Sequence, residues 1–218
     1  MTEHGEAPER FDVIAGAVCL DFVNTVGGRR GGEAREHVPT YAALVEWGRE
    51  AGVLGGDDAA HLEQQAVRHR DEAGAVLARA VALREAIYAL FAARLEGRES
   101  AAQDLASLNA ELGRALHHMV VASTPDGFTW QWTRDEEAVD PMLWRVARSA
   151  ADLLLSPALQ SVRQCADETC GWLFLDMTRN RSRRWCDMRG CGNRAKVRRH
   201  RARQRMDQDG PETSTTTT

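Results

Sequence analysis

Residues 165–205 read CADETCGWLFLDMTRNRSRRWCDMRGCGNRAKVRRHRARQR, and they contain four of the five cysteines in the chain. The cysteines form two pairs, each with four residues between its members, and fifteen residues separate the pairs. Two short pairs at this distance are typical of a zinc ion bound by four thiolates, because each pair supplies two ligands from one turn. We therefore expect Cys165, Cys170, Cys186 and Cys191 to bind a single structural Zn²⁺.

The residues around the two pairs predict how this segment folds. Residues 172–175 form a short apolar run with the character of a strand, and residues 178–182 read as a polar turn. The spacer is therefore expected to fold back as a hairpin. After Cys191, a basic run without proline predicts a helix that starts at the second pair. A two-ligand turn, a hairpin and a ligand-bearing helix follow one another in treble-clef zinc fingers, so the sequence predicts a treble-clef-like zinc finger with four cysteine ligands.

The helix expected after Cys191 is strongly basic, and Asp187 is the only acid between Arg179 and Arg205. Surface helices normally mix charges of both signs, so this one indicates contact with the phosphates of a nucleic acid. Another role is open to some of the arginines, because zinc with four thiolates carries a net charge of −2 that they can offset. The residues expected to bind nucleic acid are Arg179, Arg181, Arg183, Arg184, Arg194, Lys196, Arg198, Arg199, Arg201, Arg203 and Arg205.

Two stretches resemble a known family. CGNR at residues 191–194, with RRWC before it at 183–186 and AKVRRHR after it at 195–201, is similar to the CGNR zinc fingers of bacteria. GAVCLDFVNT at residues 16–25 resembles the ABATE domain that precedes this finger in that family. The resemblance implies a stress-related transcription regulator, and it favours DNA over RNA as the partner.

Charge divides the chain into two parts. Residues 163–206 carry 13 Lys/Arg and 4 Asp/Glu, whereas residues 1–162 carry 15 and 25. A basic segment joined to an acidic body predicts a polyanionic partner at one end only.

No apolar run has the length of a membrane span, and cysteines in metal spacing suit a reducing compartment, so we expect a cytoplasmic protein that does not contact membranes. The fifth cysteine, Cys19, lies in an apolar run and is expected in the core.

The residues before the finger predict a mainly helical domain with a small antiparallel sheet, which makes the whole an α+β fold. Apolar residues recur at helical spacing from residue 76 to residue 95, and Asp140-Pro141 is a good helix start. Residues 128–132 alternate aromatic and polar side chains, which predicts a hairpin with its aromatic face against the helices. The expected parts are 1–157, the helical domain; 158–206, the zinc finger with its basic helix; and 207–218, a disordered tail.

Asp21, Asn24 and Thr25 are polar residues in an otherwise apolar segment. Two interpretations are open for them. They can be buried side chains that hydrogen-bond the backbone, or they can form the wall of a pocket for a small ligand.

The function that the sequence favours is a zinc-dependent DNA-binding transcription regulator, whose N-terminal domain senses a small-molecule effector or forms a homodimer. The alternative is an RNA-binding or scaffolding zinc module without regulatory DNA sites. An enzyme is not expected. A nuclease built on such a finger would use Asn193 and His200 with a catalytic metal, and the acid-poor segment offers little to hold one.

Overall fold

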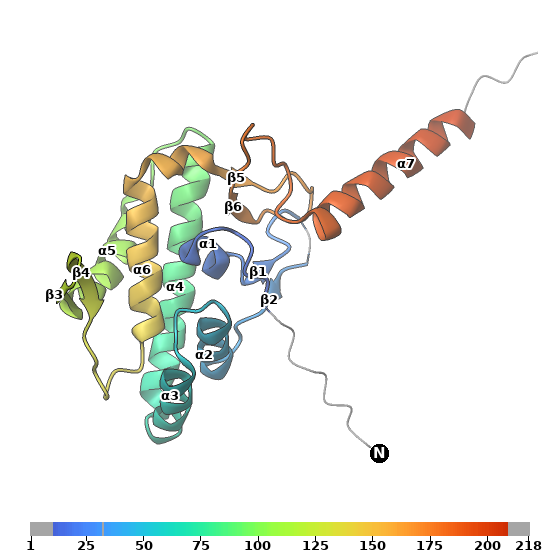
Figure 1. Cartoon of the computed structure of the whole chain (residues 1–218). Coiled ribbons are helices and arrows are strands. Elements are labelled where there is room, and N and C mark those ends of the chain that lie inside the picture. The colour runs from blue at the N-terminus through green and yellow to red at the C-terminus, as the bar shows by residue number, and fades with distance from the viewer. Residues whose placement is uncertain (1–10, 32, 209–218) are drawn as a thin grey trace, which may run out of the picture.

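The structure, a computed structural model, describes residues 11–31 and 33–208, with the side chains of the last helix described as far as Gln204. Its N-terminal part is built around α4, against which α1, α2, α3, α5 and α6 pack (Figure 1). The elements in chain order are α1 (Val18–Val23), β1 (Val26–Gly27), β2 (Arg35–Glu36), α2 (Tyr41–Glu50), α3 (Gly56–Arg68), α4 (Arg70–Leu95), α5 (Ala102–His117), β3 (Met119–Thr124), β4 (Gly127–Trp132), α6 (Pro141–Leu155), η1 (Pro157–Ser161), β5 (Val162–Gln164), β6 (Leu173–Leu175), η2 (Met188–Gly192) and α7 (Asn193–Gln208). The fold is thus mainly helical with small antiparallel sheets, as predicted.

The helices begin and end where local chemistry favours it. The Thr40 side chain accepts a hydrogen bond from the Ala43 amide and caps α2. Pro141 stands in the first turn of α6, where its missing N–H costs nothing. The Asp140 carboxylate makes no capping hydrogen bond and instead forms an ion pair with Arg79 of α4 at 2.7 Å. This contact ties the start of α6 to the central helix.

The aromatic hairpin forms in the predicted place, but its packing is not as predicted. β3 pairs with β4, with Val121 opposite Trp130. Phe128 is 83% exposed and Trp130 is 57% exposed, so the expectation that the aromatic face packs on the helices is wrong for these two. Trp132, at the end of β4, does reach the helices, and its ring centroid lies 6.2 Å from that of Trp144. Alternation in a strand decides which side chains share a face, whereas the neighbouring elements decide whether that face is covered.

The finger shares the hydrophobic core of the N-terminal part. Leu173, Phe174 and Leu175 of β6 are buried, and they belong to one cluster with Leu20 and Phe22 of α1. The Leu175 amide donates to the carbonyl of Ala15 at 2.7 Å. One strand of the finger is therefore held by α1 and by Ala15, which precedes it.

Helix α7 leaves this body and projects away from it (Figure 1). It runs to Gln208, so the predicted tail begins as helix, and residues 209–218 lie outside the described residues. No helix in the described ranges is long and apolar enough to cross a membrane.

Candidate metal centre and basic helix

The four cysteines of the spacing pattern meet at one point. Their Sγ atoms all lie within 4.8 Å of one another, and all four residues are buried. The Cys170–Cys186 and Cys186–Cys191 Sγ distances are 3.7 and 3.5 Å. A tetrahedron of sulfurs around zinc needs edges of about 3.8 Å. The donor set therefore fits one structural zinc ion whose coordination is completed by protein ligands.

The cysteine sulfurs lie close enough to shift one another's pKa values. A hydrogen bond from Cys170 lowers the pKa of Cys165, whereas the pKa of Cys186 is raised by its contacts with Cys165 and Cys170. Zinc binds thiolates, so its binding releases the protons that these cysteines carry. Cys19 is not one of the clustered cysteines. It lies in the hydrophobic core, as predicted, and burial raises the pKa of its thiol to about 12.

Aspartates shape both ligand turns. In the first turn, the Asp167 carboxylate accepts hydrogen bonds from the backbone amide and the hydroxyl of Thr169, at 3.1 and 3.0 Å. In the second turn, the Asp187 carboxylate accepts from the amides of Arg189 and Gly190, and a π-helical turn then leads into α7. These side chains satisfy backbone donors that the tight turns leave free.

Glycine is required at the end of the first turn. Gly171 has a φ of +76°, which side-chain-bearing residues rarely adopt. A Cβ atom there would also lie 3.0 Å from the Cβ of Arg29. The turn can close on Cys170 because this position has no side chain.

The spacer between the pairs is not the hairpin that the sequence predicts. β6 forms, but its antiparallel partner is β5, which precedes Cys165. The chain returns to the metal through a loop organised by Asp176, whose carboxylate accepts from the Thr178 amide and hydroxyl and from the Arg183 amide. The strand prediction was right and the pairing wrong, because β6 binds the strand before the first ligand turn.

Two basic residues of α7 are held at the metal centre. Arg194 donates through Nη2 to the Cys191 Sγ at 2.8 Å, and through Nε to the Asp167 carboxylate at 3.3 Å. Arg198 donates to the same carboxylate oxygen at 3.1 Å. Burial alone would raise the pKa of Asp167, but hydrogen bonds from Thr169, Arg198 and Arg194 lower it below its usual value. The ionised Asp167 thus fixes the start of α7 to the first ligand turn.

Arg183 supports the second ligand turn. Its guanidinium donates to the carbonyls of Trp185 and Cys186 and lies 4.5 Å from the ring centroid of Phe174. Arg184 instead covers the ring of Trp185 at 5.3 Å. Several of the arginines expected to bind nucleic acid thus have contacts within the finger.

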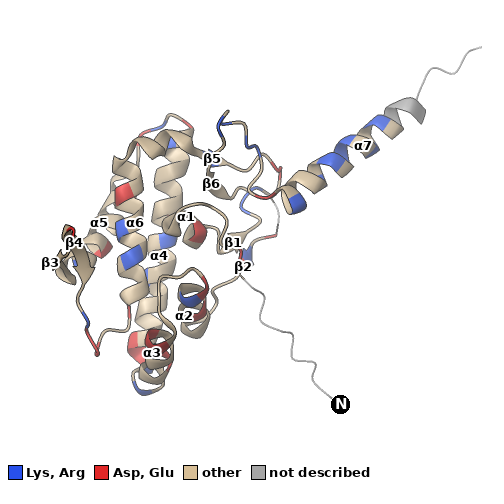
Figure 2. Ribbon diagram, viewed as in Figure 1, with Lys and Arg blue, Asp and Glu red and all other residues tan. Residues whose placement is uncertain are grey.

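The other predicted basic residues point into solvent. Figure 2 shows cations along α7 and in the loop that follows β6. The side chain of Arg205 lies outside the described part of the chain. The exposed members of the predicted set, apart from those described above, are Arg179, Arg181, Lys196, Arg199, Arg201 and Arg203. Arg189, in the second ligand turn, is also exposed, and it is not among the residues predicted from the sequence.

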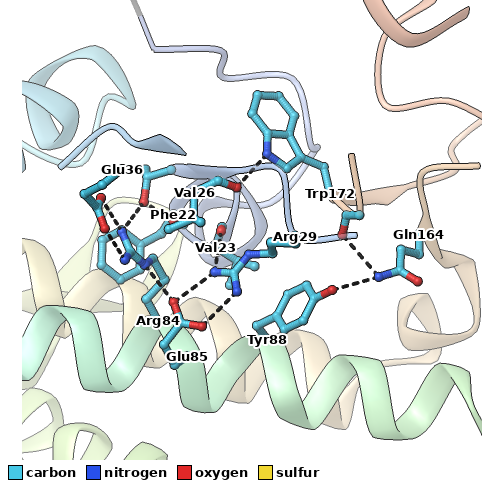
Figure 3. Close-up of polar contacts among 12 residues, drawn as sticks. Phe22, Val23, Val26, Arg29, Glu36, Arg84, Glu85, Tyr88, Gln164 and Trp172 are labelled. Carbon is cyan, nitrogen blue, oxygen red and sulfur yellow. Dashed lines mark hydrogen bonds and ion pairs between the residues drawn. The ribbon is translucent and has the colours of Figure 1, made fainter. Parts of the chain in front are cut away.

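A polar interface joins the N-terminal part to the finger (Figure 3). The backbone amide of Arg29 donates to the carbonyl of Cys170 at 3.1 Å, and its guanidinium pairs with Glu85 of α4 at 2.8 Å. The indole of Trp172 donates to the carbonyl of Val26 at 2.9 Å. Gln164 bridges the Tyr88 hydroxyl and the carbonyl of Gly171. The loop after α1 therefore contacts the first ligand turn directly.

Asp21, Asn24 and Thr25 lie together, and their hydrogen-bonding groups are engaged within the protein. The Asn24 side chain makes two hydrogen bonds to the backbone of Leu173. Its Nδ2 donates to the Leu173 carbonyl at 2.8 Å, and its Oδ1 accepts from the Leu173 backbone amide at 2.9 Å. Asp21 accepts from the Ala15 amide, and Thr25 accepts from Arg84. The same three residues line a cavity of about 300 Å³ with Trp47 and Trp172 among its other walls. Both interpretations of these residues thus have a structural basis.

Replacement of Asp21 by asparagine is expected to remove a pH-dependent part of the stability. Burial raises the pKa of Asp21 to about 6 from 3.8. Because the native state then holds a proton that the unfolded state releases, the wild-type stability falls as the pH rises from about 4 to 6, by on the order of 3 kcal/mol. In urea unfolding, Asp21→Asn should gain stability relative to wild type across this window. A constant difference between the two proteins would contradict this assignment.

The sequence did contain a signal for the aspartates that were missed. Asp-x-Thr occurs at residues 167–169 and again at 176–178, and in both places the carboxylate accepts from the threonine amide and hydroxyl. This is a local turn that Asp favours. The engagement of Arg194 and Arg198 by Asp167 carried no such signal, because it joins residues far apart in the chain.

Comparison with known families agrees with this geometry. Residues 16–157 match a family model named ABATE and described as "Putative stress-induced transcription regulator", and residues 161–204 match the CGNR zinc finger model. The search of curated proteins found no match. Both family models are the ones that the sequence motifs resemble, and the zinc finger model covers all four clustered cysteines.

Proposed function

Because the chain belongs to the ABATE family and ends in a CGNR zinc finger, we propose that it is a zinc-dependent transcription regulator that binds DNA through α7. Its N-terminal domain senses a ligand or pairs with a second copy. The observation that carries this proposal is the helix itself, which leaves the body and presents cations along its length (Figures 1 and 2).

The dimensions of α7 favour duplex DNA. Its 16 residues make a rod about 24 Å long and about 10–12 Å wide with side chains. The major groove of B-form DNA is about 12 Å wide and admits a helix. The major groove of A-form RNA is deep and narrow, so a helix does not enter it in the same way. The acidic body would be repelled by phosphates, which leaves the finger as the contacting part.

Contacts within the finger divide the basic residues by role. Arg194 and Arg198 set the direction of α7 through Asp167. Lys196, Arg199 and Arg203 lie farther from that anchor or on other sides of the helix, and they are free to bind phosphates. Asn24 bonds the finger at Leu173 of β6, and Arg29 bonds it at Cys170 of the first ligand turn, so a change in the N-terminal domain can reach the finger that carries the helix.

The expected result of a competition experiment is that duplex DNA displaces a labelled duplex from the zinc-loaded full-length protein more effectively than structured RNA does. The physical reason is the fit of α7 to the major groove of B-form DNA. The measurement is fluorescence anisotropy at several salt concentrations. Stronger competition by structured RNA would support the alternative, an RNA-binding zinc module, and would reject the DNA assignment.

A further inference from the structure

A second cavity lies at the end of the body away from α7. Its volume is about 490 Å³, and it is lined by α3, by the start of α6 and by the loop that joins β4 to α6. His61 holds this loop across the cavity, since its Nε2 lies 2.8 Å from the carbonyl oxygen of Glu136. We call it the α3–α6 cavity, and the walls that matter here are Asp57, Asp58, Trp132, Trp144 and Arg145.

Arg145 is half-buried in this cavity and forms no ion pair with the described residues, although the charge of Asp58 acts on it from the rim. Its side-chain hydrogen bond is a long one, 3.4 Å, to the carbonyl of Pro141 in its own helix, and its guanidinium lies 5.5 Å from the ring centroid of Trp132. Among residues 11–31 and 33–208, no carboxylate comes within 4.0 Å of it. Burial lowers its pKa from the usual value, and the charge of Asp58 offsets this only in part. A half-buried guanidinium of this kind favours a carboxylate from outside the chain.

Trp144 provides a second group without a partner. Its side chain is 2% exposed, and its ring stacks on His118 with centroids 3.7 Å apart. Its indole N–H has no acceptor among the described residues. Buried indole N–H groups normally find an acceptor, so this one also indicates a missing partner. Trp132 and Trp144, whose rings are tilted by 31° to each other, give the cavity an aromatic wall.

Acids at the rim restrict which anions can enter. Asp57, Asp58, Asp135 and Glu136 line the same cavity and are exposed. They would repel phosphates and other multiply charged anions, and they would attract a positive group beside the carboxylate. The contrast with the cavity beside Asp21 is clear, because there the polar side chains of Asp21, Asn24 and Thr25 already bond the protein itself.

We propose that the α3–α6 cavity binds a small aromatic zwitterion of the amino-acid type. Its carboxylate pairs with Arg145, its ring lies against Trp132 and Trp144, and its ammonium group faces Asp57 and Asp58. The existence of this ligand site does not depend on the proposed function. Only the further step, that the ligand is the effector of the regulator, rests on it. Binding is measured without DNA, so failure of one proposal leaves the other standing.

The test titrates zinc-loaded full-length protein with L-tryptophan and L-phenylalanine in a calorimeter, with 3-phenylpropionate and tryptamine as single-charge comparisons. Saturable binding of an amino acid is expected, and each single-charge analogue should bind more weakly. Arg145→Gln should weaken binding by about tenfold or more, since a charge-assisted hydrogen bond is lost. Arg148→Gln is the matched control on the same helix, because Arg148 pairs with Asp152 and should leave the affinity unchanged.

A second readout does not depend on a variant that changes the charge. In a nitrogen-proton NMR spectrum, the indole signals of Trp144 and Trp132 should shift during the titration, while those of Trp47 and Trp172 stay in place. Trp144→Phe assigns its signal. It should weaken binding about 3- to 10-fold if the ligand carboxylate, besides pairing with Arg145, accepts from the unpartnered indole N–H, because one hydrogen bond is then lost. Absence of saturable binding, equal affinity in Arg145→Gln, or shifts at Trp172 in place of Trp144 would each overturn the proposal.

Discussion

Replacement of Cys186 and Cys191 by serine is expected to abolish zinc binding and to destabilise the whole chain. The four sulfurs form one site, and loss of two ligands leaves too few thiolates to hold the metal. Small zinc modules derive about 10 kcal/mol or more of folding free energy from the ion, which is comparable with the total stability of a domain. The finger should therefore unfold.

The effect should reach the N-terminal domain because the two parts share a core. When the finger unfolds, Leu173, Phe174 and Leu175 leave the cluster that contains Leu20 and Phe22. Each exposed side chain costs about 1.5–3 kcal/mol. The thermal transition of the remaining helices should fall by on the order of 10 °C or more.

Metal analysis and circular dichroism on the same samples give the measurement. Cys19→Ala is the matched control. This thiol lies in the hydrophobic core and is not one of the four clustered cysteines, so the variant should retain one zinc ion per chain. A helical transition at the wild-type temperature in the zinc-free double variant would show that the two parts are stabilised independently. Zinc retained at full stoichiometry would reject the ligand set.

The metal centre could be predicted from the sequence because its information is local. The spacing within each cysteine pair fixes a turn, and the length between the pairs fixes how far the chain travels before it returns. The partner of β6 could not be predicted in the same way. Residues 162–164 and the spacer both offer a place for a second strand, and burial of β6 against α1 selects the first.

The roles of single arginines depended on contacts that the sequence does not carry. Arg194 and Arg201 look alike in a helical projection, and both are exposed, yet Arg194 donates to a ligand sulfur. The difference comes from Asp167 and Cys191, which the fold places beside the start of α7. Similarly, the alternation of residues 128–132 predicted the hairpin, but no neighbouring element in the described part of the chain covers Phe128.

The exposed arginines of α7 are expected to provide most of the DNA affinity. In the triple variant Arg199→Gln, Arg201→Gln, Arg203→Gln, affinity for any duplex should fall by on the order of 10²–10³-fold at about 0.1 M salt, with a decrease of about three in the salt slope. Removing phosphate contacts reduces counterion release equally for all sequences, so a scrambled duplex should lose as much affinity as any other. Fluorescence anisotropy across a salt series measures both quantities.

The control for this variant removes the same charge from the acidic body. Arg68, Arg70 and Arg98 are exposed there, and their replacement by glutamine should leave both the affinity and the salt slope unchanged. Arg194→Gln should behave differently from both sets, because Arg194 donates to Cys191 and to Asp167. Its loss should lower zinc affinity together with DNA affinity, whereas the triple variant keeps its zinc. An unchanged salt slope in the triple variant would mean that α7 does not lie on the phosphates, and the DNA contact would then have to be sought in the loop that carries Arg179 and Arg181.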